Sequence, residues 1–150
     1  MTHSMPQGLP DPEVAAEFYK DVPVKRLIAW IIDSILIAIL TTLVLPFTAF
    51  VGIFFFVALY GIGGFFYRWA TLAMGSATLG MRLASIELRM LSGDKLSGGG
   101  AFLHTLGYIV SVSVTPLQLI SIVLMLFSAR KQGLTDHILG TAAINKAARF

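Results

Sequence analysis

The chain has 150 residues, of which 56% are hydrophobic and only 13% are charged, and its mean hydropathy is +0.80. Soluble domains carry about 25% charged residues, and a soluble protein of this size could not bury so much apolar surface. The composition therefore predicts an integral membrane protein and excludes a soluble enzyme.

The chain is basic, with 11 Lys and Arg residues against 8 Asp and Glu residues. The basic residues lie beside apolar segments and form no single patch, which favours interaction with anionic lipid over binding of nucleic acid. There is no cysteine, so disulfides and thiolate metal sites are excluded. The sequence shows no nucleotide loop, metalloprotease pattern or nucleophile elbow, so we expect no enzymatic activity, metal or cofactor.

Residues 1–24 form a polar N-terminal segment. Asp11-Pro12-Glu13 has the pattern of a helix start, which predicts a short helix to about Lys20 that ends before Pro23. A mobile, solvated tail is the alternative interpretation. The segment is too long and too acidic for a signal peptide.

Two apolar segments are long enough to cross a bilayer, which takes about 20 residues. The first, residues 27–45, contains one charged residue, Asp33, and ends before Pro46. The second, residues 51–68, follows a tight uncharged turn. Both are predicted to be transmembrane helices.

The end of the second segment has aromatic and basic residues typical of the membrane surface. We expect Tyr67, Arg68 and Trp69 to act as anchors there. The glycines within the same segment predict a face on which another helix packs closely, because small residues let backbones approach. These glycines are Gly61, Gly63 and Gly64.

Residues 70–100 are more polar than the segments on either side. Apolar and polar residues alternate from Ile86 to Met90, which predicts a half-buried strand, and residues 92–95 have the composition of a turn. We therefore expect a small extramembrane loop resembling a β-hairpin. Residues 98–100, all glycine, are expected to be a flexible joint, and residues 141–145 are a second candidate strand.

Residues 102–127 form a third apolar helix with a regular set of polar residues. Their spacing is 4, 3, 4 and 3, which places them on one face of a helix. Because the phase continues across Pro116, the pattern favours one helix kinked at that residue. The polar residues are His104, Tyr108, Ser111, Thr115 and Gln118.

The distribution of basic residues leaves the path of the third segment open. The seven Lys and Arg residues at positions 20–95 place the N-terminus in the cytoplasm, because basic residues favour that side. If residues 102–127 cross the bilayer, the last four, at positions 130–149, lie outside, against the rule. If the segment re-enters by bending at Thr115 and Pro116, all 11 are cytoplasmic.

Asp33 is the most informative single residue, because a charge deep in a membrane helix costs about 2.5–3.5 kcal/mol on insertion scales. It should therefore face other helices or a polar cavity. Arg26 lies seven residues earlier, on the same face, too far for an unaided contact within one helix. Asp33 is then either a proton- or cation-binding carboxylate or a polar contact that holds helices together.

Three sequence segments in order resemble the RDD family of small membrane proteins. The segment Val24 to Asp33 has the family's Arg and first Asp, and residues 130–141 have its basic residues, second Asp (Asp136) and Gly-Thr. Residues 78–83 resemble the family's Thr-x-Gly-Lys-Arg segment but have Met81 in place of the usual Lys.

The resemblance covers residues 20–145 and implies a membrane domain at residues 25–145, followed by a basic tail at residues 146–150. It implies a family-motif site of Arg26, Asp33 and Asp136 that can bind an ion or proton. The supporting motif residues are Thr78, Gly80, Arg82, Gly140 and Thr141. If the C-terminus is cytoplasmic, Arg26 can meet Asp136, and one Arg can balance both acids.

The resemblance implies a multi-pass protein of the bacterial inner membrane that transports an ion or small ligand. Three short apolar segments cannot enclose a pathway, so we expect a homo-oligomer or a membrane-protein partner within the lipid bilayer. The alternative is a non-enzymatic scaffold or accessory subunit in which the Arg and Asp residues are structural.

Overall fold

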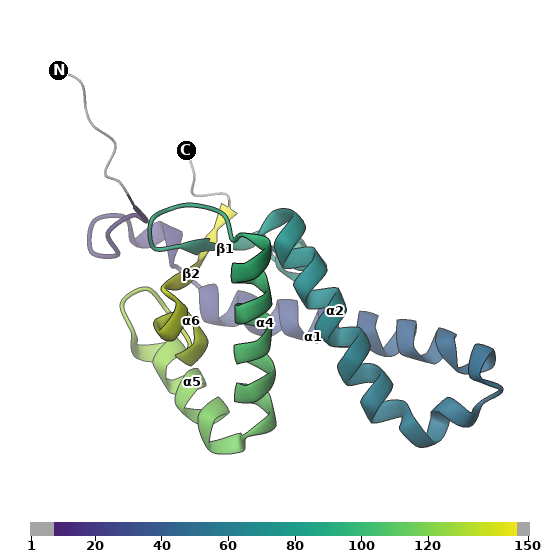
Figure 1. The fold of residues 1–150 in the computed structure, drawn as a ribbon. Helices are drawn as coiled ribbons and strands as arrows, with labels where there is room; N and C mark the ends of the chain where they lie inside the picture. Colours follow the sequence, from purple (N-terminus) through teal and green to yellow (C-terminus); the bar gives the residue numbers. More distant parts are fainter. Residues whose placement is uncertain (1–7, 147–150) are drawn as a thin grey trace.

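The computed structural model describes residues 8–146, and the remainder of both predicted tails lies outside this range. Helix α1 (Val22–Val44) and helix α2 (Phe56–Gly75) form a long hairpin. With the short 3-10 helices at its tip, η2 (Leu45–Thr48) and η3 (Val51–Phe55), each arm is long and apolar enough to cross a membrane. Figure 1 shows the tip extending away from the rest of the molecule.

The boundaries of these two helices differ from the prediction at the start of α1 and at both ends of α2, which begins at Phe56 because residues 51–55 form η3. Helix α1 begins at Val22, because Pro23 lies in its first turn, where the missing N–H has no helical partner to lose. Helix α2 continues to Gly75 and ends where Ser76 adopts a left-handed conformation, with φ of 56°. The prediction that the second helix ends at residue 68 was therefore wrong.

The third apolar segment is two helices, α4 (Gly98–Ser113) and α5 (Thr115–Phe127), bent by 114°. Val114 between them is extended, and Pro116 in the first turn of α5 has no N–H to continue α4. The kink predicted at Pro116 is thus a sharp bend between two helices, because helical phase on both sides of a break does not require one axis. Figure 1 shows α5 running back beside α4, as in the re-entrant alternative.

The polar end of the molecule contains α3 (Leu79–Leu83), β1 (Ile86–Met90), α6 (Leu134–Leu139) and β2 (Thr141–Asn145). Both predicted strands are present and pair antiparallel, from Ile86 opposite Asn145 to Met90 opposite Thr141. The partner of β1 is thus the C-terminal strand rather than a neighbouring one. The expected glycine joint is also wrong: residues 98–100 form the first turn of α4, where the Gly100 N–H donates to the Ser97 hydroxyl.

The N-terminal segment packs on the sheet from residue 8 onward. Instead of the predicted helix to Lys20, it contains only the 3-10 helix η1 (Ala16–Phe18). Tyr19 is buried, and its hydroxyl donates to the Pro10 carbonyl. The Asn145 amide donates to the carbonyls of Glu17 and Lys20, so the described part of this segment is held in place rather than being a mobile tail.

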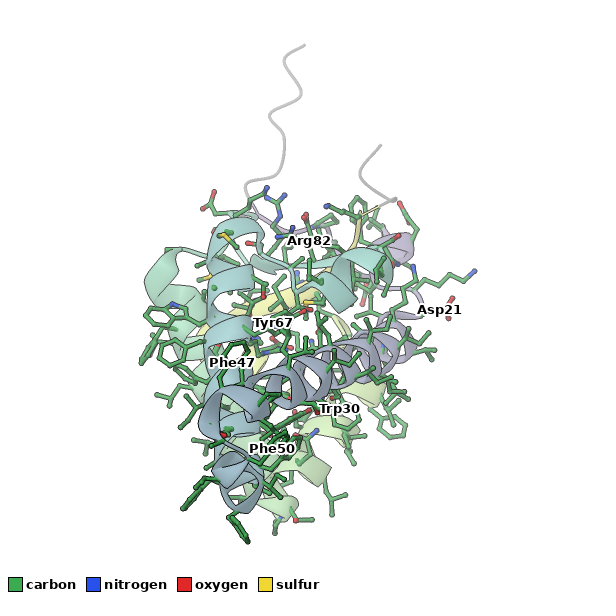
Figure 2. The ribbon with its side chains drawn as sticks, turned by 90° about the vertical axis from the view of Figure 1, so that its right-hand side faces the viewer. Asp21, Trp30, Phe47, Phe50, Tyr67 and Arg82 are labelled. Atoms are coloured by element: carbon green, nitrogen blue, oxygen red, sulfur yellow. The ribbon has the colours of Figure 1, made fainter. Side chains whose placement is uncertain are left out.

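Buried apolar residues gather at the polar end, where the sheet, α3 and the ends of the long helices meet. The middle of the α1–α2 hairpin exposes large apolar side chains to its surroundings, as expected of helices in lipid. Gly64 packs on Ile37, but Gly61 and Gly63 have open space around them, so the predicted close-packed face holds only at Gly64. Figure 2 looks onto the uncharged tip of the hairpin, with Phe47 and Phe50 below Arg82 in that view.

The bent α4–α5 pair predicts the sidedness of the polar segments. Because the chain has no natural cysteine, single cysteines can replace the exposed residues Phe47, Lys95 and Ala129. In sealed vesicles we expect an impermeant thiol reagent to reach positions 95 and 129 from the same side and position 47 from the other. Labelling of 95 and 129 from opposite sides would show that α4 and α5 together cross the bilayer.

Candidate functional site

Asp33 lies on α1 with 6% of its surface exposed, and all its hydrogen-bond donors come from other elements. Its Oδ1 accepts from the Tyr67 hydroxyl at 2.6 Å and from the Gly80 N–H at 2.9 Å. Its Oδ2 accepts from the Thr78 hydroxyl at 2.6 Å. The carboxylate therefore joins α1 to α2 and to the start of α3 through uncharged donors.

Thr78 and Gly80, of the Thr-x-Gly segment, both donate hydrogen bonds to Asp33. Thr78 is the N-cap of α3, and its hydroxyl accepts from the Met81 N–H while donating to Asp33. Gly80 touches α1 so closely that a Cβ would lie 2.2 Å from the Ala29 carbonyl oxygen and 2.9 Å from Asp33 Cγ. Only glycine fits here, because any side chain would separate α3 from α1.

Asp136 is the centre of a second cluster and has no exposed surface. Its Oδ2 forms an ion pair with the Arg26 guanidinium and accepts from the Gly133 N–H at 3.0 Å. Its Oδ1 lies 2.8 Å from His104 Nε2, which donates because a carboxylate only accepts, and 2.8 Å from the Thr141 hydroxyl. Asp136 thus joins α1, α4, α6 and β2.

The backbone around Asp136 explains the Gly-Thr pair of the C-terminal motif. Gly140 ends α6 in a left-handed conformation, with φ of 67°, and so turns Thr141 back toward the carboxylate. Burial alone would raise the pKa of Asp136. The charge of Arg26 and the hydrogen bonds from His104 and Gly133 outweigh it and hold that pKa well below its usual range.

The two acids are therefore not balanced by one arginine, as the sequence interpretation allowed. Arg26 meets Asp136 as expected, but within residues 8–146 no ion pair joins Arg26 to Asp33. Arg82 is exposed and does not line the site. Of the supporting motif residues, Thr78, Gly80, Gly140 and Thr141 thus act on the two clusters.

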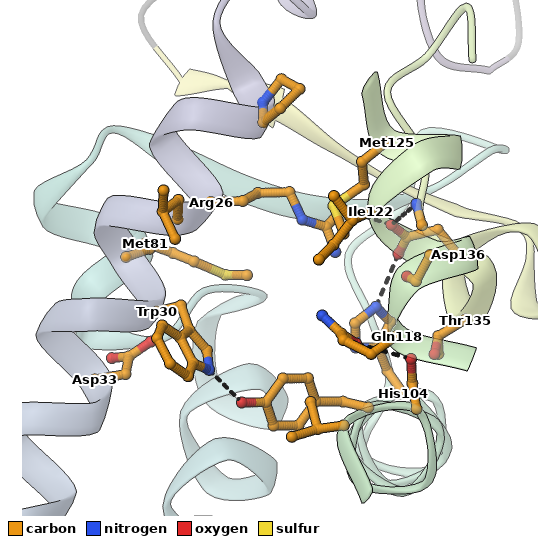
Figure 3. Close-up of a pocket in the computed structure, with 18 of the residues that line it drawn as sticks. Arg26, Trp30, Asp33, Met81, His104, Gln118, Ile122, Met125, Thr135 and Asp136 are labelled. Carbon is orange, nitrogen blue, oxygen red and sulfur yellow. Dashed lines mark hydrogen bonds and ion pairs between the residues drawn. The ribbon is translucent and has the colours of Figure 1, made fainter. Parts of the chain in front are cut away.

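A pocket of about 540 Å³ lies between α1 and the wall formed by α4, α5 and α6. Figure 3 shows Arg26 and Trp30 on one side and His104, Gln118 and Asp136 on the other, with Asp33 at the edge beyond Trp30. The volume is within the range of about 300–1,000 Å³ common for small-molecule sites. In residues 8–146 no three acidic or His side chains are grouped to bind a metal.

Most of the predicted polar stripe lines this pocket. His104, Tyr108, Ser111 and Gln118 contribute to its wall, and the Ser111 hydroxyl donates to the Gln118 side chain at 2.9 Å across the bend. Thr115 does not, because it is exposed at the bend itself. The stripe is thus a property of two helices that face the same cavity.

Three further residues were not predicted to belong to the site. Tyr67 and Arg68 face inward rather than acting as surface anchors, since Tyr67 binds Asp33 and the Arg68 guanidinium lies 4.2 Å from the centre of the Tyr108 ring. Trp30 Nε1 donates to the Tyr108 hydroxyl at 2.7 Å. The sequence contained a signal for Arg68, because a charge within an apolar segment needs a partner, as it does at Asp33.

The close approach at Gly80 predicts a strong effect of adding one methyl group. Gly80→Ala should lower the free energy of unfolding by about 1–3 kcal/mol, because the new Cβ overlaps Ala29 and displaces the N–H from Asp33. Chemical unfolding in detergent micelles measures this. Gly63→Ala is the matched control, since nothing lies within 4 Å of its Cβ position, and an equal loss there would contradict the argument.

The Arg26–Asp136 ion pair predicts a larger loss. Arg26→Gln should lower the free energy of unfolding by about 3–5 kcal/mol, because it leaves a buried carboxylate without its charged partner. Arg82→Gln removes the same charge from an exposed position and should change stability by less than about 0.5 kcal/mol. Similar stabilities for the two variants would show that the pair does not hold the fold.

Comparison with known proteins agrees with the motif assignment. Neither a curated protein nor a solved structure matches the chain. The family model of the RDD family matches residues 22–140, which include Arg26, Asp33 and Asp136 and most of the chain. The chain therefore belongs to the RDD family.

Proposed function

We propose that this protein is a component of a membrane transport system and that Asp33 is its ion or proton site. The observation that carries the proposal is that Asp33 lies within a membrane-spanning helix, lines the pocket and has no charged partner within residues 8–146. Acids in such positions are functional sites by default.

The contrast with Asp136 supports this choice. Protonating Asp136 would break its ion pair with Arg26. It would also remove the charge that accepts hydrogen bonds from four donors. Protonating Asp33 would break no ion pair, because its partners are two hydroxyls and one N–H. We therefore assign Asp136 a structural role and propose Asp33 as the ion or proton site.

The hydroxyl partners of Asp33 suit a group that changes its protonation state. A hydroxyl both donates and accepts, so Thr78 or Tyr67 can donate to the carboxylate and, after rotation, accept from the protonated acid. A guanidinium partner could not do this, because it has no acceptor. The site can thus gain or lose a proton while its hydrogen bonds reorganise locally.

Transport by this protein also depends on its assembly and on its location. Two spans and one bent pair cannot enclose a pathway, so transport requires a homo-oligomer or a membrane-protein partner. We propose that the N-terminus is cytoplasmic, because the basic residues flank the helices and the tip at residues 45–55 is uncharged. The bacterial inner membrane is the location that we propose with it. No enzymatic step is part of the proposal.

A scaffold or accessory subunit is the second candidate, and the contacts of Asp33 favour it in one respect. They connect three helices, α1, α2 and α3, so the same carboxylate could serve only to hold the fold. The two functions differ in the role of the charge, which one substitution removes.

Asp33→Asn separates the two candidates because it keeps the shape of the side chain. The amide oxygen can still accept from Tyr67 and Gly80, and the amide nitrogen can donate to the Thr78 oxygen. We expect a folded protein that has lost proton movement driven by a sodium or potassium gradient in sealed vesicles. Wild type and variant are compared at equal amounts of folded protein.

The opposite results would support the scaffold. If neither protein moves protons and the variant is unstable, the carboxylate is structural and the transport proposal is wrong. If the folded variant moves protons at the wild-type rate, Asp33 is not the ion site.

A further inference from the structure

Arg68 is a cation that lines the pocket and binds neither Asp33 nor Asp136. It lies on α2, lines the pocket and places its guanidinium over the Tyr108 ring. Within residues 8–146 it forms no ion pair, its side chain donates no hydrogen bond, and its Nε is buried. The five N–H donors of this guanidinium therefore have no acceptor in the described protein.

The nearby carboxylates are already occupied. Asp136 is bound by Arg26 and three further donors, and Asp33 by its three neutral donors. Buried donors without acceptors cost free energy, and more so when they are charged. A ligand that presents anionic oxygens to Arg68 would remove this cost, and a guanidinium binds carboxylate and phosphate through paired hydrogen bonds.

The residues at the opening of the pocket indicate what a ligand would carry besides its anionic group. Val24 and Leu27 on α1 and Ile122 and Leu126 on α5 line the pocket and are 41–58% exposed. In a bilayer the exposed surface of such helices meets acyl chains. The pocket therefore has an apolar opening towards lipid and an unneutralised cation inside.

We propose that this pocket binds a single-chain anionic amphiphile from the surrounding bilayer. Its carboxylate or phosphate head binds Arg68, and its chain leaves between α1 and α5 along Leu27 and Ile122. The volume of about 540 Å³ suits a head group with one chain. Asp33 lines the same pocket, but this proposal does not depend on the role proposed for Asp33, and its test measures binding rather than flux.

Trp30 lines the pocket and can report on the chain, because bromine atoms quench tryptophan fluorescence at short range. The chain has two tryptophans, so Trp69→Phe leaves Trp30 as the only one. This protein is placed in phosphatidylcholine vesicles with a brominated fatty acid or its methyl ester, at a pH at which the acid is ionised. We expect the acid to quench Trp30 at a mole fraction about tenfold lower than the ester, the scale of one charge-assisted hydrogen bond.

Three further variants in the Trp69→Phe background test whether Arg68 causes the preference. Arg68→Gln should abolish it, Arg68→Lys should keep part of it, and Lys95→Gln, which removes an exposed charge outside the pocket, should leave it unchanged. Equal quenching by acid and ester in the protein that retains Arg68 would overturn the proposal, whether or not the Arg68 variants fold. A preference that survives in folded Arg68→Gln would overturn it as well.

Discussion

The ion pair between Arg26 and Asp136 connects the first helix to the last, and the path of the chain between them follows from it. A bilayer core is about 30 Å thick, so an Arg at the start of α1 and an Asp beyond α5 can meet only if the third segment returns to its starting side. The bend at Val114 provides that return. The ion pair can form only if the chain bends in this way. Without the bend, the buried carboxylate of Asp136 would lack its cation, and the fold would lose stability.

The two motif acids have different environments although both are nearly inaccessible. Asp136 has a charged partner and three further donors, and it organises the end of α6 and the start of β2. Within residues 8–146, Asp33 has only uncharged donors, which come from α2 and from the start of α3. The same residue type therefore forms an ion pair in one cluster and, within residues 8–146, accepts only neutral hydrogen bonds in the other.

The pocket is a consequence of where these clusters lie. Asp33 binds α1 to α3, and the ion pair of Arg26 with Asp136 binds α1 to α6. Helix α1 is therefore held at two positions along its polar face. Between them, α1 stands apart from α4 and α5, and the intervening space is lined by Trp30, Tyr108 and Gln118. Arg68 enters this space from α2 and has no acidic partner within residues 8–146, so it adds a positive charge that neither motif acid supplies.

The sequence by itself determined the membrane class, both spanning helices, both strands and the identity of the motif residues. Each depends on local properties: apolar length, period-two alternation, and motif spacing within about a dozen residues. It placed a kink at Pro116 but did not determine how sharply the chain turns between α4 and α5, because the polar stripe has the same phase whether one helix or two carry it. Nor did it distinguish Asp33 from Asp136, or place Tyr67 and Arg68 inside. Arg26 and Asp136 are 110 residues apart and Asp33 and Gly80 are 47 apart, so only the tertiary structure decided which donors each carboxylate meets and which cation remains unpaired.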